Sequence, residues 1–179
     1  MKKSLSLLII TIIALTSSIN ANAWTDRNTF GLKGPVKAVY ENNYEYPSLE
    51  FEEDGDIIFE EGDGVNGQQL SRDKNNRIHS VGYWNNYYIF SYNKKGQVSK
   101  KIDVCELVEN TITYTYNTKG HIIKSVSKYP PAYEIPTEIT TYTYQKFDKY
   151  GNWIKRTAKS KYGTSVETRT VETRTITYY

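Results

Sequence analysis

Residues 90–100 read FSYNKKGQVSK, and this stretch holds the pattern from which the fold can be predicted. An aromatic residue is followed by Asn93, two lysines, Gly96 and then an apolar residue, Val98. The side chain of Asn can accept hydrogen bonds from the backbone that follows it, which starts a turn. Glycine adopts a positive φ at no steric cost, and aromatic and β-branched residues favour strands. The stretch therefore predicts two antiparallel strands joined by a loop of about four residues.

The same order recurs along the chain, most clearly in residues 114–124 and 145–155 and more weakly in residues 70–79 and 51–58. Asn76 replaces the turn glycine in one of the weaker units. The sequence assigns structural roles in these turns to Asn93, Gly96, Asn117, Gly120, Asp148, Gly151 and Trp153. A reactive site would not be expected to recur with its side chains replaced each time, whereas a turn would. Asp148→Asn is accordingly predicted to be nearly silent, because Asn fills that place in two sister units.

The fold class predicted from these units is all-β: an antiparallel meander of repeated β-hairpins whose sheet is curled or partly closed. Adjacent apolar residues, such as Ile122 and Ile123, put apolar side chains on both faces of one strand. Either both faces are partly covered, or a bulge shifts the register. The expected strands are residues 36–43, 48–53, 56–61, 68–72, 77–83, 87–92, 97–103, 107–116, 121–128, 138–147, 152–159 and 165–178.

Residues 1–23 have the order of a secretory signal peptide. Lys2 and Lys3 precede an apolar run from Leu5 to Leu15, and Ala21-Asn22-Ala23 has the small-x-small form of a cleavage site. The apolar run is too short for a spanning helix. We expect cleavage after Ala23, a single β-repeat domain over residues 24–179, and a periplasmic or secreted location without stable membrane insertion. An uncleaved membrane anchor is the alternative.

The repeated unit resembles the tyrosine-aspartate (YD, or RHS-type) repeats of bacterial surface and secreted proteins. In addition, Gly31-Leu-Lys-Gly-Pro-Val-Lys-Ala-Val39 resembles the opening of small exported repeat proteins common in Bacteroidetes. Those proteins close on an Asp-x-x-Gly-Asn-Trp unit and an Arg-x-Ile-x-Tyr strand, which correspond here to residues 148–153 and 174–178. The resemblance implies a β-repeat fold and an exported address, and it supplies no catalytic residues.

Neither the net charge nor the acidic cluster of the chain predicts a specific metal site or reaction. The whole chain carries a formal charge of +3, and it is close to neutral without Lys2 and Lys3. Residues 50–63 hold eight carboxylates and no Lys or Arg, so Asp54, Asp56 and Asp63 could offer oxygen ligands to Ca²⁺. A solvated acidic hairpin explains the same residues, and it could sit against, or compete for, a basic face. Separately, Lys100, Lys124 and Lys155 would form a basic row if the hairpins stack in register. No metal or other cofactor is expected.

The cysteine and histidines do not form a known catalytic pattern. Cys105 is the one cysteine, and we expect it to be buried because free cysteines usually are. A nucleophile pair of Cys105 and His121 is conceivable, but no local signature supports it. His79 and His121 are expected to lie on the surface, and neither has the spacing of a zinc site.

Tyrosine is the best functional lead, with 17 in the chain. Exposed rings on a sheet can stack on sugars or form an apolar patch for a protein partner. The candidate binding residues are Tyr83, Trp84, Tyr87, Tyr88, Tyr129 and Tyr133. The expected role is a non-catalytic binding or scaffold module of the cell envelope or secreted space, with a glycan or protein ligand and no nucleic-acid partner. The alternatives are an inhibitor or immunity-type partner of a secreted toxin, and a carboxylate-based hydrolase.

Overall fold

The computed structural model describes residues 24–58, 69–83, 85–106 and 108–179. Its described part forms one antiparallel sheet of 11 strands in the order β2-β1-β11-β10-β9-β8-β7-β6-β5-β4-β3. The elements are α1 (Asp26–Thr29), β1 (Val36–Glu41), β2 (Leu49–Glu50), β3 (Gln69–Arg72), β4 (Ile78–Tyr83), β5 (Asn86–Tyr92), β6 (Val98–Cys105), β7 (Val108–Tyr116), β8 (Ile122–Lys128), η1 (Pro131–Tyr133), β9 (Glu138–Phe147), β10 (Trp153–Tyr162) and β11 (Thr168–Tyr178). The predicted all-β antiparallel meander is confirmed.

Two parts of the predicted topology differ from the structure. The strand expected at residues 56–61 is reduced to an isolated bridge between Phe51 and Ile57, and residues 59–61 lie outside the described part. The first strand, β1, pairs with the last, β11, so β11 lies between β1 and β10 in the sheet. The sheet remains open, because β2 and β3 stand at opposite ends of the strand order.

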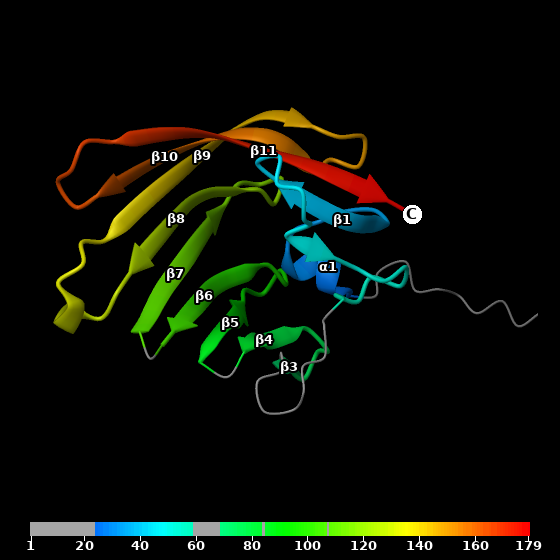
Figure 1. Ribbon diagram of the computed structural model, residues 1–179, viewed down its shortest axis with the longest axis horizontal. Coiled ribbons are helices and arrows are strands. Elements are labelled where there is room, and N and C mark those ends of the chain that lie inside the picture. Colours follow the sequence, from blue (N-terminus) through cyan, green and yellow to red (C-terminus); the bar gives the residue numbers. More distant parts are fainter. Residues whose placement is uncertain (1–23, 59–68, 84, 107) are drawn as a thin grey trace, which may run out of the picture.

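The N-terminal segment joins the two ends of the curled sheet. Figure 1 shows α1 between β1 on one side and β3 and β4 on the other. Asp26, which is 0% exposed, accepts two hydrogen bonds from the Arg72 guanidinium of β3, at 2.6 and 2.9 Å. Arg27 Nε donates to the carbonyl of Val36 in β1 at 2.7 Å. An ion pair and side-chain hydrogen bonds from α1 thus link the β1 and β3 ends of the sheet, which in a closed sheet would be joined by strand pairing.

The apolar core lies at the α1 end of the molecule. One buried cluster contains Leu32, Val36, Val39 and Phe51, and a second contains Ile78, Val81, Phe90 and Val98. Phe30, which directly follows α1, packs against both clusters. The face of the sheet toward α1 is called the inner face below, and the opposite face is the outer face. Away from α1, the inner face carries tyrosines, hydroxyl groups and arginines.

Four turns of the sheet have the same hydrogen bonds. In each, one side-chain oxygen of an Asn or Asp accepts from the backbone amides two and four residues later, over 2.8 to 3.1 Å. The residues are Asp73, Asn93, Asn117 and Asp148. The residue three positions later has a positive φ in every case, including Asn76 with φ 60°. The turns therefore follow from one local pattern, as Asx-type turns do.

A bulge follows each of these turns. The strand registers slip at the second residue of the returning strand, which leaves His79, Ser99, Ile123 and Ile154 as the extra residues. The adjacent apolar residues Ile122 and Ile123 are thus explained by the bulge, one of the two possibilities that the sequence leaves open.

Tyrosine hydroxyls tie each turn region to the next pair of strands. Tyr92 donates to the carbonyl of Ile78, Tyr116 to that of Val98 and Tyr144 to that of Ile122, over 2.6 to 2.7 Å. In each case the acceptor is the first residue of a returning strand. Arg174 Nε makes the corresponding bond to Trp153, at 2.5 Å. Buried tyrosines usually need such a partner, and this arrangement supplies one at regular intervals.

Candidate functional site

Asn152 fixes the N-terminal segment over the turn between β9 and β10. The Asn152 side chain is 1% exposed, and its Oδ1 accepts from the backbone amide of Lys33 at 2.8 Å. Its Nδ2 donates to the carbonyl of Lys33 at 2.8 Å and to the Tyr178 hydroxyl at 3.0 Å. Gly34 lies against the ring of Tyr150, where a Cβ would stand 2.6 Å from Cδ1. These contacts place the Lys33 side chain beside the β9–β10 turn.

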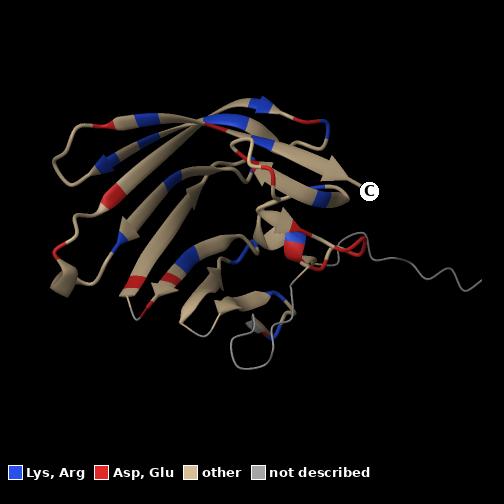
Figure 2. Ribbon diagram, viewed as in Figure 1, with Lys and Arg blue, Asp and Glu red and all other residues tan. Residues whose placement is uncertain are grey.

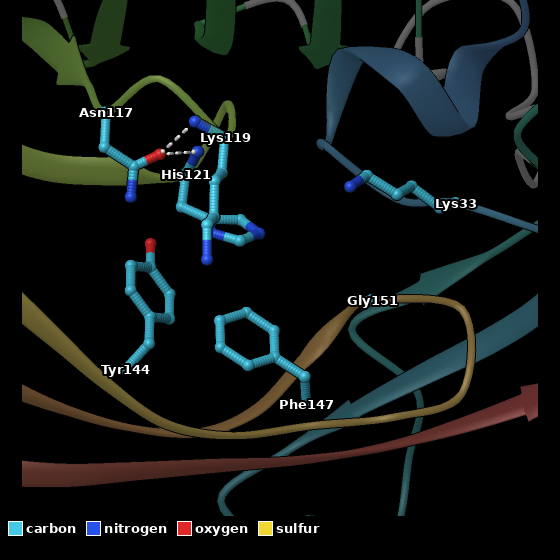
Figure 3. A pocket seen from close by; sticks show the side chains of 7 residues that line it. All are labelled: Lys33, Asn117, Lys119, His121, Tyr144, Phe147 and Gly151. Carbon is cyan, nitrogen blue, oxygen red and sulfur yellow. Dashed lines mark hydrogen bonds between the residues drawn. The ribbon is translucent and has the colours of Figure 1, made fainter.

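A hollow of about 470 Å³ opens where Lys33, the β7–β8 turn and the β9–β10 turn meet. It is called the rim pocket here. Figure 3 shows the rings of His121, Tyr144 and Phe147 gathered on one side of it, with Lys33 across from them. The lining residues are Lys33, Asn117, Lys119, His121, Tyr144, Phe147 and Gly151.

Three rings form one wall of the rim pocket. His121 stacks on Phe147 with ring centroids 4.7 Å apart, and it lies 5.1 Å from Tyr144. The Tyr144 hydroxyl is held by the carbonyl of Ile122, so this ring has a fixed orientation. Phe147 is 39% exposed and leaves apolar ring surface available at the pocket. The wall can therefore stack against a flat or partly apolar ligand.

Polar groups complete the pocket. Asn117 Oδ1 accepts hydrogen bonds from the backbone amides of Lys119 and His121, at 3.0 Å each. The NH₂ group of Asn117 points toward Tyr144 in Figure 3. Burial, and then the charge of Lys33, lower the pKa of His121, which favours the neutral imidazole. Its Nε2 is buried and has no hydrogen-bond partner among the described residues. The pocket thus offers ammonium groups and a side-chain amide to a ligand, whereas the buried ring nitrogen of His121 is not accessible from it.

A stack of rings and guanidinium groups continues from this wall along the inner face. Arg156 lies over Tyr142 at 4.2 Å and over Trp153 at 4.1 Å, and Arg174 lies over Trp153 at 4.0 Å. Glu172 binds Arg156 Nε at 2.5 Å. Burial, and then repulsion by Arg156, lower the pKa of Arg174 to about 10. Trp153 is 6.3 Å from Tyr144, so this rigid stack supports the ring wall.

Of the six binding residues predicted from sequence, the five that the structure describes do not come together in one surface. Tyr83 and Tyr88 are exposed near the β4–β5 turn, and Tyr87 faces the other side of β5 from Tyr88. Trp84 lies outside the described residues. Tyr129 and Tyr133 lie in the β8–β9 connection, and β6 and β7 separate them from the first group. None of the five described tyrosines lines the rim pocket.

Other expected sites also change. Cys105 is exposed, so the prediction of a buried cysteine is wrong; it ends β6, in the turn that leads into β7. His121 lies beyond the other end of β7, which separates this pair. His121 is also partly buried rather than a surface residue, while His79 is exposed.

The described part of the acidic stretch is held by arginines at the α1 end. Asp54 accepts from the amide of Asp56, Asp56 lies 3.6 Å from Arg72, and Asp63 is outside the described residues. No group of three or more potential metal ligands is found among the described residues. The described part of the acidic stretch therefore lies beside Arg72 and α1.

The pocket residues were not identified from the sequence, because the local pattern shows which tyrosines share a strand face but not which distant residues meet them. The alternation Thr-Tyr-Thr-Tyr in residues 141–144 places Tyr142 and Tyr144 on one face, which could have pointed to the ring wall. Nothing local to Lys33 indicates that it meets residues more than a hundred positions away.

No protein-family model matches the chain, and no curated protein matches it in sequence. The fold and site define its class: an all-β protein with one open, curled antiparallel sheet and an aromatic-walled pocket at its rim. No helix in the described ranges is long and apolar enough to span a membrane.

Proposed function

We propose that this protein is an exported, non-catalytic binding module that takes a sugar unit of a glycan in the rim pocket. The observation that carries the proposal is the combination of exposed ring surface at Phe147 with Asn117, Lys33 and Lys119 around one hollow. Binding pockets typically combine apolar and aromatic walls with a few placed polar groups. A sugar ring fits this pattern, because it has apolar C–H faces and a rim of hydroxyl groups.

The composition of the pocket supports binding over hydrolysis. Glycoside hydrolysis in most families uses two carboxylates that flank the scissile bond. The residues that line the rim pocket include no Asp or Glu and no Cys or Ser. His121 is the one candidate base, and its ring is stacked on Phe147 rather than oriented by a carboxylate.

The exported address is part of the same proposal. Residues 1–23 supply the signal pattern, and Trp24, the first residue after the expected cleavage, packs edge-on against Tyr92 at 5.8 Å.

The relationship to YD or RHS-type repeats is likewise proposed. It is supported by the four turns with the same side-chain hydrogen bonds.

The test is glycan binding by residues 24–179, screened on an array of neutral and acidic oligosaccharides and measured by calorimetry. Phe147→Ala is expected to weaken binding at least tenfold. Tyr133→Ala removes a similarly exposed ring from the surface predicted by sequence and should leave affinity unchanged. The rim pocket is excluded as the site if the two variants behave the other way round, and the non-catalytic role is excluded if the ligand is cleaved.

A second candidate function has its own observation. Tyr44 and Tyr46, in the β1–β2 loop, are 72% and 78% exposed. Exposed tyrosines are common anchors of protein interfaces. They favour the alternative of an inhibitor or immunity-type partner of a secreted protein. Capture of one defined protein by the native chain, lost in a Tyr44→Ala, Tyr46→Ala variant, would support this function over the glycan module.

A further inference from the structure

The outer face of the last four strands carries a concentration of positive charge. Ile176 and Tyr178 pack into the core on the inner face of β11, so residues 169, 171 and 173 point outward. The registers then place their partners on the outer face of β8, β9 and β10. The cations on this surface, called the outer basic face, are Lys124, Lys128, Lys146, Lys155, Lys159, Lys161 and Arg169.

Like charges stand directly opposite one another on this face. Lys146 pairs in register with Lys155, and Lys159 pairs with Arg169. Lys124 lies in the same cross-strand row as Lys159, with Thr141 between them. Directly opposed like charges destabilise a sheet, and neighbouring strands are only about 4.8 Å apart. The opposed cations therefore lower the folding stability, and this cost favours a binding role for the surface that carries them.

Counter-charges are almost missing from this surface. No Asp or Glu occupies the outer face of β8, β9, β10 or β11, all four of which are described in full. The acidic residues of these strands, Glu138 and Glu172, point to the inner face. One ion pair reaches the outer basic face, between Lys159 and Glu167 at 3.1 Å in the approach to β11. Figure 2 shows Lys and Arg recurring along these strands.

We propose that the outer basic face binds an anionic polysaccharide, a chain with carboxylate groups along its length. Threonines stand between the cations, at Thr141 in the row of Lys124 and Lys159 and at Thr173 beside Lys155. Ammonium groups pair with the carboxylates, and threonine hydroxyls bond to sugar hydroxyls. The face is the convex side of a curled sheet (Figure 1), so a flexible chain can follow it while a flat membrane touches only its crest.

The probe is polygalacturonate, with neutral dextran, phosphatidylglycerol vesicles and double-stranded DNA as comparison ligands. Residues 24–179 are expected to bind polygalacturonate and not dextran. Binding should weaken at least tenfold when NaCl is raised from about 0.05 M to about 0.3 M, because salt screens exposed charges. Equal or stronger binding to vesicles or DNA at matched charge concentration would overturn the proposal, as would no binding to polygalacturonate.

Charge reversal separates binding from folding. The double variant Lys155→Glu, Lys159→Glu places a carboxylate opposite Lys146 and another opposite Arg169. The variant gains opposite charges across strands at both positions and loses the exposed Lys159–Glu167 ion pair, so its melting temperature should stay close to that of the native chain while polygalacturonate affinity falls at least tenfold. Lys94→Glu, Lys95→Glu, in the β5–β6 turn, is the control and should keep most of the affinity.

Unchanged affinity in the double variant would overturn the proposal. The result is independent of the rim pocket, because Phe147→Ala is expected to retain polygalacturonate binding by the outer basic face. If Phe147→Ala abolishes it and the charge reversal does not, the polymer binds at the rim pocket and the outer face has no such role.

Discussion

The side chain of Asn152 binds both backbone polar groups of Lys33, although the two residues are 119 positions apart. Asn152 belongs to the Asp-x-x-Gly-Asn-Trp unit, and Lys33 belongs to the Gly-Leu-Lys-Gly segment near the other end of the domain. The two segments that carry the sequence resemblance are thus bound to each other. Their contact holds Lys33 at the rim pocket and closes the N-terminal segment over the sheet.

Asn152→Ala is expected to lower the free energy of unfolding by about 2–4 kcal/mol, since it removes the three hydrogen bonds that the buried Asn152 side chain makes to Lys33 and Tyr178. Urea denaturation followed by tryptophan fluorescence measures the change. Asn75→Ala, at an exposed turn position, is the control and should stay within about 0.5 kcal/mol of the native chain. Equal stability of the two variants would show that the Lys33 contact contributes nothing.

Gly34→Ala should destabilise the protein far more than Gly31→Ala. Both glycines have a positive φ, +77° and +67°, so both substitutions carry a similar backbone cost. Only at position 34 would the new Cβ meet the Tyr150 ring, whereas nothing lies within 4 Å at position 31. Thermal unfolding of the two variants compares them, and we expect Gly34→Ala to cost at least about 1–2 kcal/mol more. A cost equal to that of Gly31→Ala would mean that Tyr150 moves aside freely.

Asp148→Asn is no longer expected to be silent. In addition to the turn amides, Asp148 Oδ2 accepts a hydrogen bond from the Tyr178 hydroxyl, a contact that Asn93 and Asn117 lack. An amide NH₂ at that position would face a hydroxyl that already receives a hydrogen bond from Asn152. The variant should lose about 1–3 kcal/mol at pH 7, and Asn117→Asp, the reverse exchange in a sister turn, should lose less.

The same residue predicts a pH dependence. Burial alone would raise the pKa of Asp148, but hydrogen bonds from Tyr178 and the amides of Asn152 and Tyr150 hold it below its ordinary value of 3.8. Its contribution is therefore complete above the unfolded pKa and is lost as the pH falls through the folded pKa. The stability difference between the native chain and Asp148→Asn should shrink from about pH 5 downward. A difference that stays constant to pH 3 would contradict this assignment.

Tyr116→Phe should cost about 1 kcal/mol, because it removes the hydrogen bond to the carbonyl of Val98. Tyr114→Phe is the matched control, two residues earlier on the same face of β7, where burial raises the pKa of the hydroxyl to about 12 and no side-chain hydrogen bond holds it in the described structure. Chemical denaturation of both variants isolates the value of the recurring tyrosine bond. If Tyr114→Phe costs as much, that bond has no special part in joining the hairpins.

Asp26→Ala should cost about 3–5 kcal/mol, because it removes the buried partner of Arg72. Glu167→Ala, which breaks the exposed pair with Lys159, should cost no more than about 1 kcal/mol. Comparable losses in the two variants would show that α1 does not hold the ends of the sheet together.

Much of the fold could be predicted because it is repeated locally. An Asn or Asp, a residue with positive φ and a following apolar residue are enough to produce a turn such as that of Asn117 and Gly120. The strands of the meander follow, since consecutive strands pair with their neighbours. The bulge at Ile123 was only one of two possibilities, because adjacent apolar residues have more than one explanation.

The candidate site was mostly beyond prediction from sequence. The composition shows that the chain is rich in tyrosine. It does not show which tyrosines, Tyr88 among them, lie together on one surface. Phe147 and His121 form a wall only because β8 and β9 pair in one register. Lys33 joins them only after the N-terminal segment has docked on Asn152.

The sequence by itself determined the all-β class, the turn positions and the order of the strands from β3 to β11, because these depend on contacts between near neighbours in the chain. Tertiary structure alone decided that β1 pairs with β11, that α1 bridges Arg72 and Val36, and that Lys33 meets Asn152. These contacts join residues far apart in sequence, and no local propensity specifies which distant partner a buried Asp, Arg or Asn will find. Burial makes each of them selective, because a polar group removed from water must find a partner.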